Sequence, residues 1–116
     1  MATYKGSCHC GKTKFEVEGE LKQVLSCNCS ICRRKGALLW GMPATGFKLL
    51  TPPSNLKTYE FNKHVIHHKF CTTCGINPFS EAADKSGNKM VAVNVRCLDG
   101  VDLDKLEVKH IDGAKL

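Results

Sequence analysis

The sequence has no apolar run that approaches the roughly 18 residues of a membrane-spanning helix. Residues 1–6 contain no apolar segment of the kind found in a secretory signal peptide. The chain also has no internal repeat, no low-complexity segment, and no Lys/Arg run with interleaved aromatic residues beyond residues 33–35. We therefore expect a cytoplasmic protein with neither a membrane partner nor a nucleic-acid partner.

The positive charge of the chain is moderate, and it gives no reason to change that expectation. The formal net charge is +6 when every cysteine is counted as neutral. A basic excess of this size does not indicate a nucleic-acid surface.

Cysteine is the residue type in which this sequence is rich, with eight in 116 residues. Seven of them form three clusters, namely Cys8 with Cys10, then Cys27 with Cys29 and Cys32, then Cys71 with Cys74. A structural zinc site has four protein ligands, whereas a catalytic zinc has three and keeps one position for water or substrate. Joining the two outer pairs gives four ligands and leaves three in the middle. The counts predict two Zn²⁺ per chain, one structural and one able to do chemistry.

Disulfides, an iron-sulfur site and unliganded thiols are the alternatives to zinc. A disulfide framework requires an oxidising compartment, and no secretory signal indicates one. Two sulfurs spaced as Cys-x-Cys are also poorly placed to bond each other. The composition is 42% apolar, so a core can form without disulfides. Softness and spacing of the ligands favour zinc.

Length and hydrophobic pattern predict one all-β domain that spans residues 1–116. Residues 12–18 alternate in polarity, and Gly19 separates them from a second run at residues 21–26, so these two segments are expected to form a hairpin. Further strands are expected at residues 38–42, 47–50, 56–61, 65–70 and 90–95. A helical turn is expected at residues 30–35 and in the region after Asp99. The connections between the strands would then carry the metal ligands.

The outer cysteine pairs share a glycine that the middle cluster lacks. Cys10 and Cys74 are each followed by glycine, which readily takes the positive φ that curls a backbone around a metal and aims its N–H groups at sulfur. A metal shared by these pairs would clamp the N-terminal region to the middle of the chain. We expect this site to be structural.

The middle cluster is followed by Arg33 and Arg34. Cys29 and Cys32 are three residues apart, as on one face of a helical turn. Zinc with three thiolates carries a net charge of −1, which the two guanidinium groups would partly offset. The same groups are well shaped to bind the carboxylates of a substrate, and they can also be solvated surface charge.

Four segments together resemble the glutathione-dependent formaldehyde-activating enzyme family, which also includes centromere protein V. They are Gly-Ser-Cys-His-Cys-Gly at residues 6–11, Cys-Asn-Cys-Ser-Ile-Cys-Arg-Arg-Lys-Gly at 27–36, Phe-Cys-Thr-Thr-Cys-Gly at 70–75, and Val-Asn-Val-Arg-Cys-Leu-Asp at 93–99. The resemblance implies an Mss4-like β-tent of small antiparallel sheets. It also implies a structural zinc on Cys8, Cys10, Cys71 and Cys74, and a catalytic zinc on Cys27, Cys29 and Cys32.

The activity that the resemblance implies is the condensation of glutathione with formaldehyde to S-hydroxymethylglutathione, a reaction of the carbon-sulfur lyase class. Zinc deprotonates a thiol bound at its open position and so delivers a nucleophile that can attack an aldehyde. Polarisation of the aldehyde oxygen and activation of a water are the other uses of such a metal. Three thiolates weaken its Lewis acidity, which favours thiol binding. A non-catalytic binding module with the same fold is the alternative function.

The histidines and the eighth cysteine need separate predictions. His64, His67 and His68 lie near the last cysteine pair and can supply a proton shuttle or play a surface role. Because side chains alternate along a strand, His67 and His68 are expected on opposite faces. His9 is expected to point outward. Cys97 is either a buried free thiol or a fourth ligand that closes the middle site.

Overall fold

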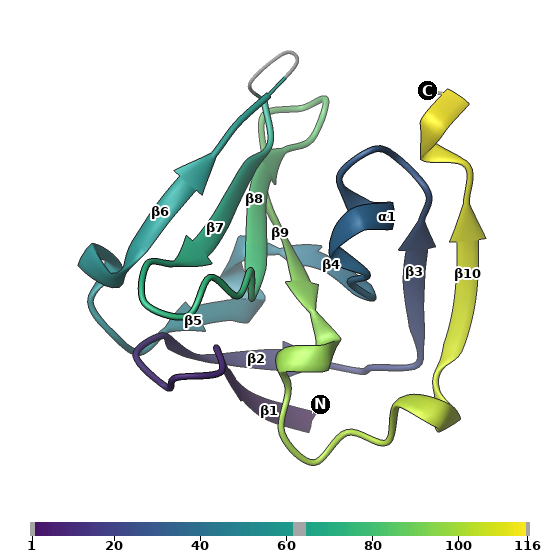
Figure 1. Ribbon diagram of the computed structural model, residues 1–116. Helices are drawn as coiled ribbons and strands as arrows, with labels where there is room; N and C mark the ends of the chain where they lie inside the picture. The colour runs from purple at the N-terminus through teal and green to yellow at the C-terminus, as the bar shows by residue number, and fades with distance from the viewer. Residues whose placement is uncertain (1, 62–64, 116) are drawn as a thin grey trace.

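The computed structural model describes residues 2–61 and 65–115, and its described part is mainly strand (Figure 1). The strands are β1 (Ala2–Ser7), β2 (Lys14–Gly19), β3 (Gln23–Cys27), β4 (Leu39–Pro43), β5 (Phe47–Leu49), β6 (Leu56–Tyr59), β7 (His67–Cys71), β8 (Phe79–Ala83), β9 (Lys89–Asn94) and β10 (Glu107–Ile111). One short helix, α1, spans Cys32–Lys35. Short 3₁₀ turns lie at Ala44–Gly46, Pro53–Asn55, Val95–Cys97, Leu103–Lys105 and Gly113–Lys115. The all-β prediction is confirmed.

The strands form two sheets. The smaller sheet has the order β1-β2-β5, and the larger one has the order β10-β3-β4-β9-β8-β7-β6. In Figure 1 the smaller sheet runs along the lower edge of the molecule, below the strands of the larger sheet. The expectation of purely antiparallel sheets needs one correction, because β10 pairs with β3 in parallel. A parallel pair requires a long crossover, and most of the chain separates these two strands.

The predicted hairpin between residues 12–18 and 21–26 is wrong. Strand β2 pairs with β1 and β5, whereas β3 belongs to the other sheet. The glycine that suggested a turn has a different use, since a Cβ at Gly19 would lie 2.8 Å from the ring of Trp40. Gly19 therefore allows the two sheets to approach each other where the chain passes between them.

The other predicted strands are confirmed to within a few residues, as β4, β5, β6, β7 and β9. Strands β1 and β8 carried no prediction. The region after Asp99 does contain a short 3₁₀ turn, but it continues into β10. Within residues 2–61 and 65–115, no helix is long and apolar enough to span a bilayer.

The hydrophobic core lies between the smaller sheet and one face of the larger sheet. Phe15 and Val17 of β2 and Val93 of β9 are fully buried in it. The ring of Phe47 lies 5.4 Å from that of Phe15 and 4.5 Å from that of Phe79, measured between centroids. Each such buried side chain contributes about 1.5–3 kcal/mol to folding. This core fixes the larger sheet, whose opposite face is then free to build a site.

Candidate metal centres and their pockets

The two outer cysteine pairs come together in space. The Sγ atoms of Cys8, Cys10, Cys71 and Cys74 all lie within 4.8 Å of one another. Cys10 Sγ is 3.6 Å from Cys8 Sγ and 3.5 Å from Cys71 Sγ, too far for a disulfide, which is about 2.05 Å long. A tetrahedral zinc with Zn–S bonds of about 2.3 Å places its sulfurs about 3.8 Å apart. These four cysteines, hereafter the quartet, are positioned to bind a metal ion.

Backbone N–H groups point at the sulfurs of the quartet. The N–H of Thr13 donates to Cys8 Sγ over 3.4 Å. The backbone N–H groups of Cys74 and Thr73 stabilise the thiolate of Cys71 and lower its pKa from 9.0 to about 6. The structure thus favours the thiolate form of Cys71, which is the form that binds a metal, whereas the pKa of Cys10 is raised to about 11.

The glycines that follow the outer pairs have the predicted conformation. Gly11 has φ 81° and Gly75 has φ 78°, both in the left-handed region. The N–H of Gly75 donates to the carbonyl of Cys71 over 2.9 Å, which closes the turn. Nothing lies within 4 Å of a Cβ built on Gly75, so the backbone conformation rather than space requires glycine there.

The three middle cysteines also come together. Cys27 ends β3, Cys29 lies in the following turn, Cys32 begins α1, and their Sγ atoms lie within 4.8 Å of one another. Among the described residues, no further Cys, His, Asp or Glu joins this group, hereafter the trio. Burial, together with the nearby thiols of Cys8 and Cys74, raises the pKa of Cys97 to about 11. Cys97 therefore lies towards the quartet and does not close the trio.

The local charge at the trio differs from the sequence-based expectation. The cation that acts on these thiols is Lys35: burial lowers the pKa of its ammonium group, and the nearby thiolates of Cys32 and Cys29 oppose that change. Burial likewise raises the pKa of Cys32 to about 12. A metal ion bound here would favour the thiolate form of this buried cysteine.

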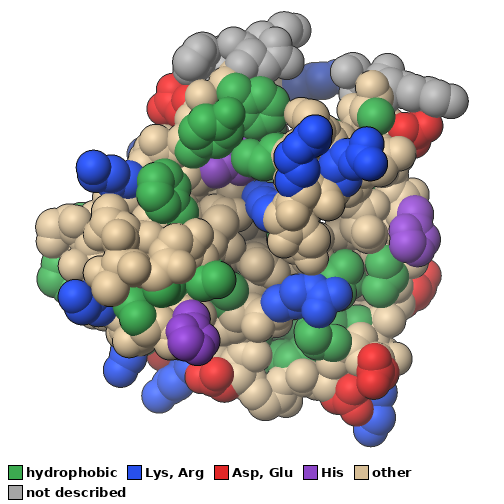
Figure 2. Space-filling view, in the orientation of Figure 1, with side chains coloured by type: hydrophobic (Ala, Val, Ile, Leu, Met, Phe, Trp, Pro, Cys, Tyr) green, Lys and Arg blue, Asp and Glu red, His purple; other side chains and the backbone are tan. Residues whose placement is uncertain are grey.

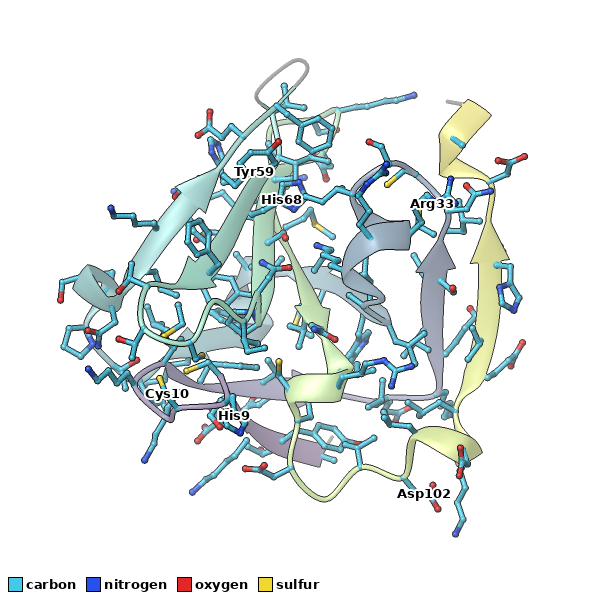
Figure 3. All side chains as sticks on the ribbon, in the orientation of Figure 1. His9, Cys10, Arg33, Tyr59, His68 and Asp102 are labelled. Atoms are coloured by element: carbon cyan, nitrogen blue, oxygen red, sulfur yellow. The ribbon has the colours of Figure 1, made fainter. Side chains whose placement is uncertain are left out.

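Arg33 and Arg34 do not act together. The Nη1 of Arg34 donates to the carbonyl of Ser30 over 2.7 Å, and this side chain lines a surface hollow with Tyr59 and Phe61. Arg33 instead lines a pocket beside the trio. Figure 2 shows Lys and Arg side chains gathered over the region that α1 occupies in Figure 1, and Figure 3 places Arg33 far from Cys10 of the quartet.

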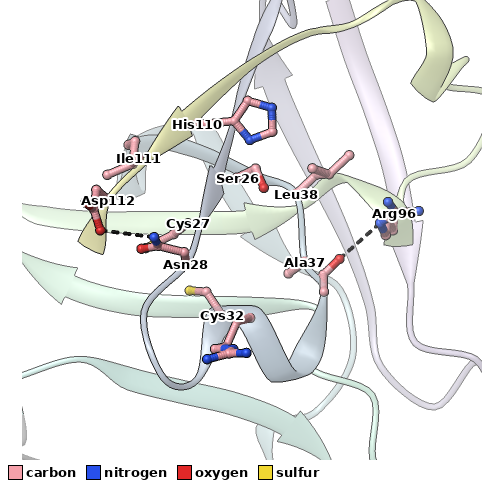
Figure 4. Close-up of a pocket in the computed structure, with 12 residues that line it drawn as sticks. Ser26, Cys27, Asn28, Cys32, Ala37, Leu38, Arg96, His110, Ile111 and Asp112 are labelled. Carbon is pink, nitrogen blue, oxygen red and sulfur yellow. Dashed lines mark hydrogen bonds between the residues drawn. The ribbon is translucent and has the colours of Figure 1, made fainter. Parts of the chain in front are cut away.

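The pocket next to Arg33, hereafter the cationic pocket, has a volume of about 530 Å³ (Figure 4). Cys27 and Cys32 of the trio form part of its wall, Arg96 and His110 add to its basic lining, and Asp112 is its acidic lining residue. The Nε of Arg96 donates to the carbonyl of Gly36 over 3.2 Å. That bond holds the guanidinium group at the edge of the pocket.

The segment after β10 covers one side of the trio. Asn28, which lies between two cysteines of the trio, donates from Nδ2 to Asp112 Oδ1 over 3.0 Å and accepts at Oδ1 from the N–H of Ala114 over 3.0 Å. A Cβ at Gly113 would lie only 2.4 Å from Cys27 Sγ. The backbone at Gly113 is therefore in close contact with the trio.

A second pocket, hereafter the apolar pocket, lies beside Cys29 and Cys32 and has a volume of about 240 Å³. His68 lines it and is buried, with Nδ1 3.1 Å from Ser80 Oγ. His67 points to the other face, with Nδ1 2.6 Å from Glu60 Oε1. The predicted separation of these two histidines is confirmed, and His9 is exposed as expected. His64 lies outside the described residues.

Residues 3–111 match the family model of the glutathione-dependent formaldehyde-activating enzyme. The chain belongs to this family. Its fold is also similar to the crystal structure of a Rhodobacter sphaeroides protein solved as a structural genomics target. The TM-score is 0.77 at 32% sequence identity, and the match covers 90% of this chain and 99% of that chain.

Within this member of the glutathione-dependent formaldehyde-activating family, the sequence identified the cysteines but missed several residues around them. Lys35 followed the arginines in the motif and was not distinguished from them. Arg96 immediately precedes Cys97, and His110 and Gly113 lie in a region that carried no prediction of a site. Arg96 could have been identified from the sequence as a basic residue next to Cys97. The positions of His110 and Gly113 depend instead on the parallel pairing of β10 with β3.

Proposed function

We propose that this protein is a zinc-dependent enzyme of the carbon-sulfur lyase type. It joins a thiol such as glutathione to formaldehyde or a related aldehyde at the trio of Cys27, Cys29 and Cys32. The observation that carries the proposal is a group of three sulfurs, without a fourth ligand from the described residues, at the wall of a pocket with two guanidinium groups. Because this chemistry requires reduced thiols, we place the protein in the cytoplasm.

The donor set suits zinc at both clusters, which gives two Zn²⁺ per chain. Cysteine thiolates in groups of four and three match closed and open zinc sites respectively. When zinc is held by three cysteines, its remaining position can accept a thiol substrate and lower the pKa of that thiol. Lys35 supplies positive charge beside Cys32 and Cys29 and so offsets the excess negative charge of the trio.

The cationic pocket suits a thiol that carries carboxylates. Its volume of about 530 Å³ falls within the range of about 300–1,000 Å³ that is usual for small-molecule sites. Arg33 and Arg96 line it, and a guanidinium group binds a carboxylate through two parallel hydrogen bonds. Glutathione has two carboxylates and one thiol, so its carboxylates pair with the arginines while its sulfur reaches the trio.

The reaction is an addition in which nothing leaves. The sulfur of the thiol forms a bond to the carbonyl carbon of the aldehyde, and the carbonyl oxygen takes up the proton that the thiol has released. The segment of Asp112, Gly113 and Ala114 is held against one side of the trio, so substrates approach from the pockets on its other sides. Most of the rate acceleration would then come from holding the two reactants together in the reacting geometry.

The quartet has a structural role in this proposal. Cys8 and Cys10 follow β1 of the smaller sheet, whereas Cys71 ends β7 of the larger sheet. A metal ion shared by them ties the two sheets together at the edge of the core. In small metal-dependent domains, zinc supplies on the order of 10 kcal/mol of apparent folding free energy.

The test compares Cys29→Ser with Cys74→Ser in zinc-loaded protein. Zinc content, circular dichroism and turnover of glutathione with formaldehyde are measured for both variants. We expect Cys29→Ser to keep its fold and one zinc while losing turnover, and Cys74→Ser to unfold. A wild-type protein that binds two zinc ions but shows no turnover with any thiol would favour a non-catalytic binding module, and equal loss of fold in both variants would contradict separate roles.

A further inference from the structure

The floor of the apolar pocket is a row of side chains that crosses four strands. Gly41 of β4 is the register partner of Ala92 in β9, Ala92 is the partner of Ser80 in β8, and Ser80 is the partner of His68 in β7. Their immediate neighbours Val91 and Val93 point to the opposite face, into the core. Three small residues in register leave a hollow on a sheet face, and the histidine stands at its end.

The apolar pocket and the cationic pocket lie on two sides of the same trio. Cys32 lines both of them, whereas Cys27 lines the cationic pocket and Cys29 the apolar one. The apolar pocket is further lined by the hydrophobic side chains of Ile31, Leu39, Phe61, Ile66 and Met90. The two pockets therefore reach the trio from two sides and adjoin at Cys32, where reactants bound in them can meet.

His68 supplies a polar group at the edge of this apolar surface. Its side chain is 7% exposed, and Nδ1 lies 3.1 Å from Ser80 Oγ. Nε2 is buried and has no hydrogen-bond partner among the described residues of the protein. A buried polar atom without a protein partner, when it lies in a pocket, can bind a water or the polar group of a ligand.

The imidazole of His68 is neutral at neutral pH. Burial, together with the positive charge of Lys35 and the neighbouring His67, lowers its pKa from 6.5. A neutral imidazole has one N–H, and in the tautomer in which the Ser80 hydroxyl donates to Nδ1 this N–H is on Nε2. Nε2 is then a hydrogen-bond donor, and its ligand must carry an acceptor.

We propose that the apolar pocket binds the carbonyl substrate, that this substrate is an aldehyde with an apolar substituent, and that its oxygen accepts a hydrogen bond from His68 Nε2. The inference rests on the proposed function, and it names a second substrate site that the thiol site does not require. Formaldehyde alone would leave most of the pocket unfilled. A cavity of about 150 Å³ accommodates benzene, so a volume of about 240 Å³ accommodates an aromatic ring with its aldehyde group.

The placement of the two reactants accounts for the addition step. A lone pair on the thiolate sulfur forms the S–C bond, and the π electrons of the carbonyl move to its oxygen. His68 stabilises the negative charge on that oxygen through its N–H, as a neutral imidazole can do in a preorganised site. The oxygen then takes up the proton that the thiol released, so the product is a hemithioacetal and no oxidant or reductant is needed.

The test uses zinc-loaded wild type, His68→Leu, His68→Gln, Gly41→Val and, as a control, Thr3→Val. Gly41→Val places a side chain on the pocket floor where a Cβ meets nothing within 4 Å, so the strand tolerates it. Thr3→Val adds the same residue to an exposed position of β1, outside both pockets. Benzamide, which has a ring and a carbonyl but does not react, serves as the binding probe, and thermal stabilisation is the readout.

Stabilisation by benzamide reports on binding in the apolar pocket, and kcat/KM for the two aldehydes reports on turnover. We expect benzamide to stabilise the wild type and Thr3→Val, and Gly41→Val to lose the effect. With glutathione present, we expect Gly41→Val to lower kcat/KM for benzaldehyde at least tenfold more than for formaldehyde. His68→Leu is expected to lower kcat/KM for benzaldehyde by a factor of 10 to 100, and His68→Gln, which keeps an N–H donor, to recover part of it.

Three results would overturn either this inference or the proposed function. Turnover of formaldehyde by the wild type, without turnover of benzaldehyde or stabilisation by benzamide, overturns this inference and leaves the proposed function intact. Benzamide stabilisation that is lost in Gly41→Val, without turnover of either aldehyde, supports the ligand class of the pocket and overturns the proposed function. Equal benzamide stabilisation of the wild type and Gly41→Val would also contradict the inference.

Discussion

The ammonium group of Lys35 donates a 2.8 Å hydrogen bond to Oδ1 of Asn77. Lys35 lies three residues after Cys32, the last cysteine of the trio, and Asn77 lies three residues after Cys74, the last cysteine of the quartet. The amide of Asn77 also donates to backbone carbonyls of β7 and β8. This one contact therefore connects the turns that follow the two metal sites.

Substitution of Asn77 is expected to cost more stability than substitution of Lys35. Asn77→Ala leaves two partly buried carbonyls without a donor and Lys35 without an acceptor, for a loss of about 3 kcal/mol. Lys35→Met keeps the apolar stem and should lose about 1 kcal/mol. Urea unfolding of the zinc-loaded variants measures both, and a larger loss in Lys35→Met would contradict this ranking.

Gly113→Ala is expected to weaken metal binding at the trio and to spare the quartet. The added methyl would lie 2.4 Å from Cys27 Sγ and 3.3 Å from Cys29 Cβ, so the segment after β10 must move. We expect about one zinc per chain after dialysis against a chelator that leaves two in the wild type. Gly41→Ala, which meets nothing within 4 Å, is the matched control and should retain two.

Gly75 tests the conformational requirement of the quartet. Because its φ is 78° and a Cβ there meets no atom within 4 Å, Gly75→Ala should destabilise the protein through backbone strain alone, by about 1 kcal/mol. Gly75→Asn should cost less, since asparagine tolerates the left-handed region. Thermal unfolding of the zinc-loaded proteins gives the order, and an equal cost for Ala and Asn would exclude this explanation.

The pH dependence of stability should report on His68. Its pKa in the folded protein lies below 6.5, so the unfolded chain binds this proton at a higher pH than the folded one does. Stability is therefore lost as pH falls through 6.5 towards the folded-state pKa. The variant His68→Gln cannot titrate, so the wild type should lose stability relative to it between pH 7 and pH 5. Both proteins keep the same cysteines, so loss of metal in acid cancels in the comparison, and parallel pH curves would contradict the prediction.

The cysteine clusters could be predicted from the sequence because their geometry is local. Within each cluster, two or three residues of spacing already hold the sulfurs near one another, and the glycines after Cys10 and Cys74 indicate how the chain turns. The pairing of the two outer clusters followed from ligand counts, and the structure brings those four sulfurs together. These two inferences do not require any knowledge of how the strands pair.

The sheets and the pockets depend on long-range pairing, which the sequence patterns did not define. Gly19 was interpreted as a hairpin turn, although it serves the packing of Trp40 between the sheets. The residues of β10 alternate too weakly between apolar and polar to be recognised as a strand. Its parallel partner β3 is also distant in sequence. The row that ends at His68 arises from the register of four strands, and a shift of one residue would place those side chains in the core.

The position of β10 has a consequence for how the protein acquires its metal ions during synthesis. All four cysteines of the quartet have left the ribosome once residue 74 and a tunnel's length of chain have been made. The wall that Gly113 and its neighbours build over the trio is translated after all seven clustered cysteines. The trio can thus receive its ion before β10 docks beside β3, and the backbone at Gly113 covers it only afterwards.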